Sequence, residues 1–268
     1  MTKFLTLFDT QAAYDTAKST LDLPNVSLIA ETNAVAYKPY VPTPTETRVV
    51  AKYNVTSTSN STPLSSSYGE GIETFSAMEI DGVAQPNVVS SYTFSTTGEH
   101  TVKYTLKDST TVGMWAFWQT STLTSVYIPN SVTSISDGVF QECTGITSVT
   151  IGDSVTYIGI TSFTMCYNLT SVTIPNSVTS IANNAFLDCT GLTSVTIGSG
   201  ITSIGDNAFN DCSGLTSVTI QATTPPTLGA MVFEQTNNCP IYVPSGSVST
   251  YKAASGWSSY TSRIQAIP

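Results

Sequence analysis

Apolar and polar positions recur with a fixed spacing over the second half of the chain. The stretch LTSVTIPNSVTSIANNAF, residues 169–186, returns almost unchanged as LTSVTIGSGITSIGDNAF, residues 192–209. Two residue types keep a spacing of 23 residues through successive copies: Phe117, Phe140, Phe163, Phe186 and Phe209, and Cys143, Cys166, Cys189 and Cys212. Such a period predicts a solenoid of stacked strand-and-turn copies, because each copy completes the core of the one before.

Within one copy, the pattern separates inward from outward side chains. We predict this inward set: Leu169, Val172, Ile174, Val178, Ile181, Ala185 and Phe186. Ser171 and Thr173 point outward, because neighbouring side chains on a strand alternate between its faces. Stacking at about 4.8 Å then gives two outward rows, which are Ser125, Ser148, Ser171, Ser194 and Ser217, and Tyr127, Thr150, Thr173, Thr196 and Thr219. The pattern therefore predicts a flat strand face covered with hydroxyl groups.

Shorter patterns before the repeats predict two smaller units. Residues 1–41 contain a strand, a small helix and a hairpin, which indicate a small α+β attachment unit. Residues 42–47 are a proline-rich linker, and residues 48–108 alternate in short runs, as is typical of a small immunoglobulin-like β-sandwich. Residues 109–224 hold the repeats and residues 225–268 form a C-terminal cap. The predicted fold class is therefore mainly β.

Charge excludes several classes of partner. The 268 residues have a net charge of -9, and no Lys or Arg occurs between Lys107 and Lys252. An acidic array without cations is a poor partner for phosphates, so we expect no nucleic acid and little affinity for anionic membrane surfaces. We also expect no membrane insertion, since no 18-residue apolar segment occurs. We expect no signal peptide in the first residues, because Thr and Asp interrupt their apolar run.

Two parts of the sequence resemble known proteins. The motifs LTSVTIP (residues 169–175), SVTSI (residues 177–181) and AFLDC (residues 185–189) resemble the BspA-type leucine-rich-repeat family. The tail from Cys239 to Ile267 is similar to the cap that closes such arrays in surface proteins of gut bacteria. This resemblance covers residues 112–268. It implies a leucine-rich-repeat solenoid with a binding or adhesive surface and no fixed catalytic residues.

The N-terminal leader, FDTQAAYDTAKSTLDLPNVSLIAETNAVAYKP, is loosely similar to leaders on repeat proteins encoded by tailed phages and prophages of gut bacteria. Those leaders carry no secretion signal. A phage structural protein needs none, because it is assembled inside the host and exposed after lysis.

The reactive side chains have mainly structural interpretations. The single histidine, His100, has no evident nucleophile partner, so we assign it a structural role. The four cysteines in register follow the buried phenylalanines, and we predict reduced, buried thiols, with disulfides between neighbouring copies as the alternative. No CxxC pair or histidine cluster exists, which argues against zinc.

Acidic residues align in two columns that are interrupted. Asp188 and Asp211 share one column with Met165, and Asp137 and Asp206 share another with Ile160. Solvated loop carboxylates are the default interpretation, with calcium bridging as the alternative.

Trp115 and Trp118 stand where later copies carry mostly polar residues. They either cover the open end of the array or form a stacking platform for a sugar or a partner protein. The candidate ligand-binding residues are Trp115, Trp118, Tyr127, Ser148, Thr150, Ser171, Thr173, Ser194 and Thr196. We predict no catalytic, metal or cofactor site.

Together these features predict a non-enzymatic, modular binding protein. Our first interpretation is a phage virion appendage, in which residues 1–41 bind capsid or tail proteins and the repeats bind a host surface glycan or protein. The alternative is a bacterial cell-surface adhesin whose signal peptide was cut from this sequence. Homo-oligomers are compatible with both. An ice- or crystal-binding surface and an enzyme are less favoured.

Overall fold

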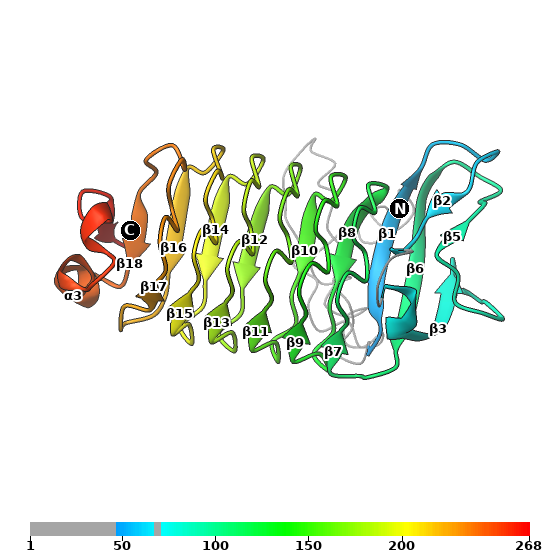
Figure 1. Cartoon of the computed structure of the whole chain (residues 1–268), viewed down its shortest axis with the longest axis horizontal. Coiled ribbons are helices and arrows are strands. Elements are labelled where there is room, and N and C mark those ends of the chain that lie inside the picture. The colour runs from blue at the N-terminus through cyan, green and yellow to red at the C-terminus, as the bar shows by residue number, and fades with distance from the viewer. Residues whose placement is uncertain (1–46, 67–70) are drawn as a thin grey trace, which may run out of the picture. The chain divides into compact units, whose positions relative to one another are not determined.

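The computed structural model describes residues 47–66 and 71–268. These residues form mainly β-structure, with two sheets that run along the repeats (Figure 1). The predicted attachment unit, residues 1–41, and residues 42–46 of the linker lie outside the described residues. Among the residues described, no helix is long and apolar enough to cross a membrane.

The larger sheet has eleven strands and follows the repeat period. Its parallel strands are β8 (Leu123–Tyr127), β10 (Ser148–Thr150), β12 (Ser171–Ile174), β14 (Ser194–Ile197), β16 (Ser217–Ile220), β18 (Ile241–Val243) and β19 (Ile264–Ala266). Ser148 pairs with both Ser125 and Ser171, and Thr173 pairs with Thr196. The predicted register of 23 residues is therefore the register of this sheet.

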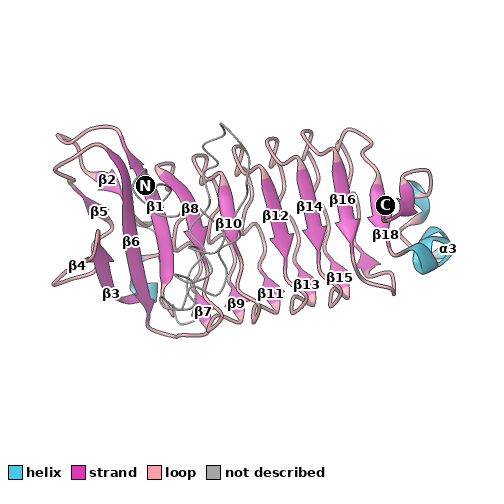
Figure 2. Cartoon of the chain, turned by 180° about the vertical axis from the view of Figure 1, so that it is seen from behind, coloured by secondary structure: helices cyan, strands magenta, loops and turns pink. Residues whose placement is uncertain are grey.

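A second sheet of six strands forms another side of the solenoid (Figure 2). Its strands have two residues each and are β7 (Thr111–Val112), β9 (Ser134–Ile135), β11 (Tyr157–Ile158), β13 (Ser180–Ile181), β15 (Ser203–Ile204) and β17 (Thr227–Leu228). Turns complete each copy and need left-handed backbone, with φ of 58° at Asn184 and 59° at Asp188. Asn and Asp adopt this conformation more readily than most residues.

The core is a continuous stack of equivalent side chains. The phenylalanine rings of neighbouring copies lie nearly parallel, with centroids 5.0 Å apart for Phe163 and Phe186. Every member of the predicted inward set between Leu169 and Phe186 is buried, which confirms that prediction. Each ring therefore packs on the copies before and after it.

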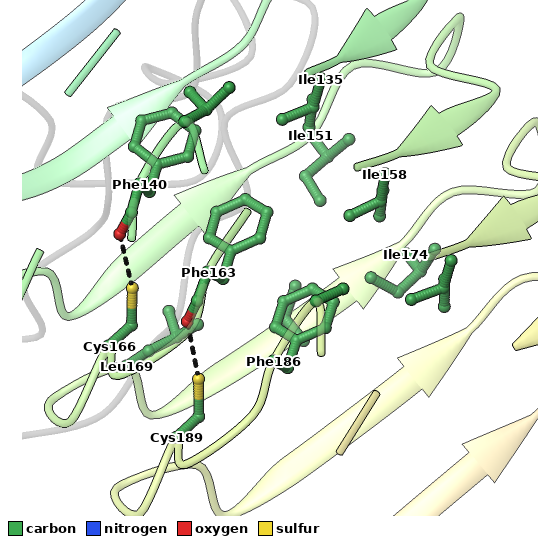
Figure 3. Packing of buried hydrophobic residues seen from close by; sticks show 14 of the residues in the cluster. Ile135, Phe140, Ile151, Ile158, Phe163, Cys166, Leu169, Ile174, Phe186 and Cys189 are labelled. Carbon is green, nitrogen blue, oxygen red and sulfur yellow. Dashed lines mark hydrogen bonds between the residues drawn. The ribbon is translucent and has the colours of Figure 1, made fainter. Parts of the chain in front are cut away.

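The cysteines lie beside these rings (Figure 3). The Cys166 thiol donates a hydrogen bond to the Phe140 carbonyl at 3.2 Å, and the Cys189 thiol donates to Phe163 at 3.1 Å. All five cysteines are free and buried, which confirms the prediction for the four in register. Burial raises the pKa of the Cys166 and Cys189 thiols, so they stay protonated and act as small apolar groups with one weak donor.

Residues 48–108 extend the larger sheet. Its antiparallel strands are β1 (Val49–Val55), β6 (Gly98–Leu106), β3 (Phe75–Ile80) and β4 (Val83–Ala84). Strand β1 also pairs antiparallel with β8 of the first repeat. A separate two-stranded sheet holds β2 (Thr62–Pro63) and β5 (Ser91–Tyr92), and η1 (Ile72–Thr74) precedes β3.

The antiparallel strands agree with the sequence pattern, but an immunoglobulin-like sandwich is not confirmed. Phe75 and Tyr104 contact the ring of Phe117, with centroid distances of 5.6 and 5.4 Å. This segment therefore shares one core with the repeats.

The C-terminal segment covers the other end of the stack. It contains η2 (Ser245–Ser247), α3 (Val248–Ala253) and η3 (Ser258–Tyr260). The indole of Trp257 is buried and donates to the Pro226 carbonyl at 2.9 Å. Arg263 is also buried and donates to the carbonyls of Phe233 and Cys239. Both sheets continue past residue 224, because β17 and β18 pair with repeat strands.

Candidate binding surface

The predicted hydroxyl rows lie on the outer face of the larger sheet. Thr150, Ser171 and Thr173 are exposed, whereas Ser194 and Thr196 are half-buried, as is Ser148. Within the part of the chain that the structure describes, these six hydroxyl groups have no hydrogen-bond partner. Strands β8 to β18 contain no charged residue. The face is therefore uncharged, and its donors and acceptors are free to contact a ligand.

Threonines next to these rows have a different role, which the sequence analysis missed. Each hydroxyl donates to the backbone carbonyl of the equivalent threonine one copy earlier, as Thr170 does to Thr147 at 3.2 Å and Thr193 does to Thr170 at 2.9 Å. The second sheet repeats this ladder, where Thr179 donates to Thr156. The signal was a recurring Thr-Ser pair where the strands of the two sheets begin, as at residues 170–171 and 179–180. The threonine of the pair binds the neighbouring copy, and the serine follows it.

The tryptophans do not join the hydroxyl rows. Both lie in the segment between β7 and β8, outside the two sheets. Trp115 is 39% exposed, and its indole covers Gly138, where an added Cβ would lie 2.3 Å from the ring Cδ1. Trp118 is half-buried and donates from Nε1 to Glu142 at 3.4 Å. Tyr127, in contrast, lies on β8 in the threonine row and is half-buried.

Aligned acidic and amide side chains bind the backbone of the next copy. Asp137 Oδ1 accepts from the Ile160 N–H at 2.7 Å, and Asn183 Oδ1 accepts from the Asp206 N–H at 2.9 Å. Asp206 Oδ1 in turn accepts from the Ala230 N–H at 2.7 Å. Among residues 47–66 and 71–268, no group of three or more His, Cys, Asp or Glu is placed to hold a metal ion. The column of Asp137, Asn183 and Asp206 therefore stabilises the stack.

His100 lies among structural contacts. Its Nδ1 is 2.6 Å from Asp81 Oδ2, and its Nε2 is 2.9 Å from the Thr96 carbonyl oxygen. The ring packs on Phe94 with centroids 4.2 Å apart. Both ring nitrogens thus have partners within the antiparallel segment.

A shallow cavity of about 410 Å³ lies over the second sheet, on a side that the sequence analysis did not single out. Tyr157 and Ile160 border it, and Ser180 and Ser203 are among the residues that form its floor. The Ser203 hydroxyl donates to the Ser180 hydroxyl at 3.1 Å. Burial and the neighbouring Asp137 carboxylate raise the pKa of Tyr157, so this phenol is neutral at ordinary pH. The cavity therefore combines an aromatic ring with neutral polar groups.

Comparison with known proteins agrees with this architecture for the repeats. The family described as BspA type Leucine rich repeat region matches residues 110–240 in six copies. A leucine rich repeat protein from T. pallidum is 26% identical, with 50% of this chain and 62% of that chain covered and a TM-score of 0.44. A leucine rich cell surface protein from Faecalibacterium prausnitzii is 31% identical, with 41% of this chain and 29% of that chain covered and a TM-score of 0.40.

A leucine-rich repeat protein from Bacteroides ovatus is 23% identical, with 58% of this chain and 50% of that chain covered and a TM-score of 0.35. The matches thus span less than two thirds of each of these three proteins. No curated protein matches the sequence. The repeat array of this chain, residues 110–240, belongs to the BspA type leucine-rich-repeat family.

Proposed function

We propose that this chain is a non-enzymatic binding protein of the surface-adhesin type, and that the outer face of the larger sheet is its recognition surface. The proposal rests on a difference between two sets of hydroxyl groups. Thr170 and its equivalents are bound to the neighbouring copy, whereas Ser171 and Thr173 have no partner among the described residues. Stacking of the copies does not require the unpartnered hydroxyl groups of Ser171 and Thr173.

The chemistry of this face favours a neutral target. It offers rows of hydroxyl donors and acceptors at a spacing of about 4.8 Å, and no charged residue lies on β8 to β18. The rows are held on paired strands, so binding would cost little conformational entropy. A host surface glycan, or a protein patch rich in hydroxyl and amide groups, fits this description.

Two surface settings are compatible with such a face. The BspA-type repeats and the resemblance of the cap to those of bacterial surface proteins support display on a cell surface. The resemblance of the N-terminal leader to phage leaders supports the second candidate, a virion appendage in which residues 1–41 bind capsid or tail proteins. We favour the cell surface, because its support comes from the repeats, whose family is established.

Antibody labelling of intact cells and of purified phage particles from the source organism separates these settings. Labelled cells and unlabelled particles are expected. Labelled particles and unlabelled cells would contradict the adhesin and support the virion appendage.

The recognition surface is tested with a panel of immobilised neutral glycans and extracellular-matrix proteins. The double variant Ser171→Ala/Thr173→Ala should bind its target at least tenfold more weakly than the wild type, with an unchanged melting temperature. The control Thr170→Val removes a ladder hydroxyl from the residue that precedes the same strand, so it should lower stability and leave affinity unaltered. Equal affinity of the double variant and the wild type would contradict the proposal.

A further inference from the structure

The copy that contains β11 departs from the repeat pattern on the second sheet. At the outward position of this sheet, neighbouring copies carry Ser134, Ser180 and Ser203, whereas this copy carries Tyr157. Three residues later, the column of Asp137, Asn183 and Asp206 is interrupted by Ile160. Two large side chains therefore replace small or polar ones in a single copy.

The replacement at Ile160 removes a hydrogen bond from the stack. Asp137, Asn183 and Asp206 each accept from a backbone N–H of the next copy. Isoleucine has no acceptor, and among the described residues the N–H of Asn183 has no partner. The Ile160 side chain is also 42% exposed. A change that weakens the stack and exposes apolar surface is the kind of local exception that marks a functional position.

Both exceptional residues border the same cavity of about 410 Å³. Gly205 and Gly229, which follow β15 and β17, also line the cavity, so no side chain projects from these two positions. The stack requires glycine at position 205, since a Cβ on Gly205 would lie 2.4 Å from Asn183 Oδ1. From β11 to β17 the cavity is about 14 Å long at the usual strand spacing. That length accommodates a short oligosaccharide.

We propose that this cavity binds a neutral oligosaccharide, with one sugar ring stacked on Tyr157 and sugar hydroxyls bound by Ser180, Ser203 and Asn183. An aromatic ring with a few polar groups suits a ligand that has both apolar and hydroxyl-bearing faces. The Asp137 carboxylate lies next to Ile160 and Tyr157, and the Asp206 carboxylate lies next to Gly229, so both are beside the cavity. This region has no Lys or Arg, and its charge disfavours anionic sugars.

An extended peptide fits this site less well. Strands β13 and β15 are paired on both sides, so they have no free edge to which a peptide strand could bind. The site is also separate from the hydroxyl rows of the larger sheet, so it stands or falls independently of the proposed recognition surface.

The test uses the full chain with cellotetraose, maltotetraose and mannotetraose, and with trigalacturonate and decaproline as comparisons. Calorimetry measures affinity, and saturation-transfer NMR identifies the contacted sugar protons. The variants Tyr157→Ser and Ile160→Asn restore residue types that other copies carry, so both should fold. Ile160→Asn should keep or raise the melting temperature, because it restores an acceptor for the N–H of Asn183. Tyr157→Phe keeps the ring and serves as the matched control.

At least one neutral tetrasaccharide should bind, and Tyr157→Ser and Ile160→Asn should each weaken that binding at least tenfold. Tyr157→Phe and the strand-face variant Ser171→Ala/Thr173→Ala should bind it as the wild type does. The proposal is overturned if none of the three sugars binds, if trigalacturonate or decaproline binds more tightly, or if both restoring variants keep wild-type affinity.

Discussion

The two ends of the repeat stack are closed by different chemistry. At the first copy, the antiparallel strands place Tyr104 against Phe117, and the phenol oxygens of Tyr53 and Tyr104 lie 2.7 Å apart. Both phenols also bond to the Leu64 carbonyl. At the last copy, the ring of Phe233 meets Trp257 and Tyr260, and the buried group beside it is the guanidinium of Arg263.

The direction of hydrogen bonds through the stack explains this difference. In four successive pairs of copies, the phenylalanine carbonyl accepts from the cysteine thiol of the next copy, from Cys143 with Phe117 to Cys212 with Phe186. The next copy has Thr236 in place of the cysteine, and its hydroxyl donates to Phe233 of its own copy. After the last copy, Phe233 has no such thiol, and Arg263 Nη1 donates to its carbonyl at 3.0 Å.

At the N-terminal end of this series of hydrogen bonds, a donor lacks an acceptor. Thr120 is the first residue of the cysteine column, and its buried hydroxyl has no partner among the described residues. A directional stack therefore needs a donor at one end, and at the other end it leaves a donor without an acceptor.

The largest expected effect is at the C-terminal end. Arg263→Met removes charged donors from Phe233, Cys239 and Thr236. Hydrogen bonds to charged groups contribute about 1.5–3 kcal/mol each, so the loss of three should lower the free energy of unfolding by at least about 4.5 kcal/mol. Chemical denaturation measures it. The control Arg48→Met breaks the partly exposed pair with Glu79 and should cost less than about 1 kcal/mol. Similar losses for both variants would show that Arg263 does not close the stack.

Alkaline pH should affect the N-terminal end next. Burial raises the pKa of Tyr53 and Tyr104 well above 10.0. Once unfolded, these phenols ionise above pH 10 while the folded state keeps its protons, so stability is full below that pH and falls above it. Each phenol contributes about 1.4 kcal/mol per pH unit. Denaturation at pH 9 and 11 should give a smaller difference for Tyr53→Phe/Tyr104→Phe than for the wild type. An unaltered difference would mean that other groups cause the alkaline loss.

The smallest effect compares both ends with one substitution. Thr120→Val removes a buried hydroxyl that has no partner and should raise the free energy of unfolding by about 1 kcal/mol. Thr236→Val removes a hydroxyl that donates to Phe233 and accepts from Arg263, so it should lower this free energy by about 1–2 kcal/mol. Thermal and chemical denaturation show whether the free energy of unfolding of each variant rises or falls. The same sign at both ends would contradict the directional account.

The register of the repeats could be predicted because the same spacing of equivalent residues recurs along the copies. Equivalent inward residues such as Val172 and Val195 pair in the sheet as their spacing requires. The alternating runs of residues 48–108 indicated short antiparallel strands, yet local alternation does not show which strand edges meet. The pairing of β1 with β8 joins segments far apart in the sequence, so the shared core was not foreseen.

The candidate surface was predicted in part for a similar reason. Periodicity placed Ser171 and Thr173 outward, but it could not distinguish hydroxyls that bind the next copy from hydroxyls that face solvent. That distinction depends on backbone carbonyls one copy away, as for Thr170 and Thr147. Tyr157 and Ile160 were readable only as departures from their columns, because a large apolar residue in a repeat usually belongs to the core.

Charge-insertion variants show whether the outer face of the larger sheet is the recognition surface, when their affinity is measured for the target identified on the panel. Thr173→Arg places a long cation in the middle of the threonine row, and Thr190→Arg places the same side chain at an exposed turn position. We expect Thr173→Arg to weaken target binding at least tenfold and Thr190→Arg to bind as the wild type does. Both variants should keep the wild-type melting temperature. Loss of binding with Thr190→Arg and full binding with Thr173→Arg would contradict the proposed recognition surface, because recognition would then lie on the turns.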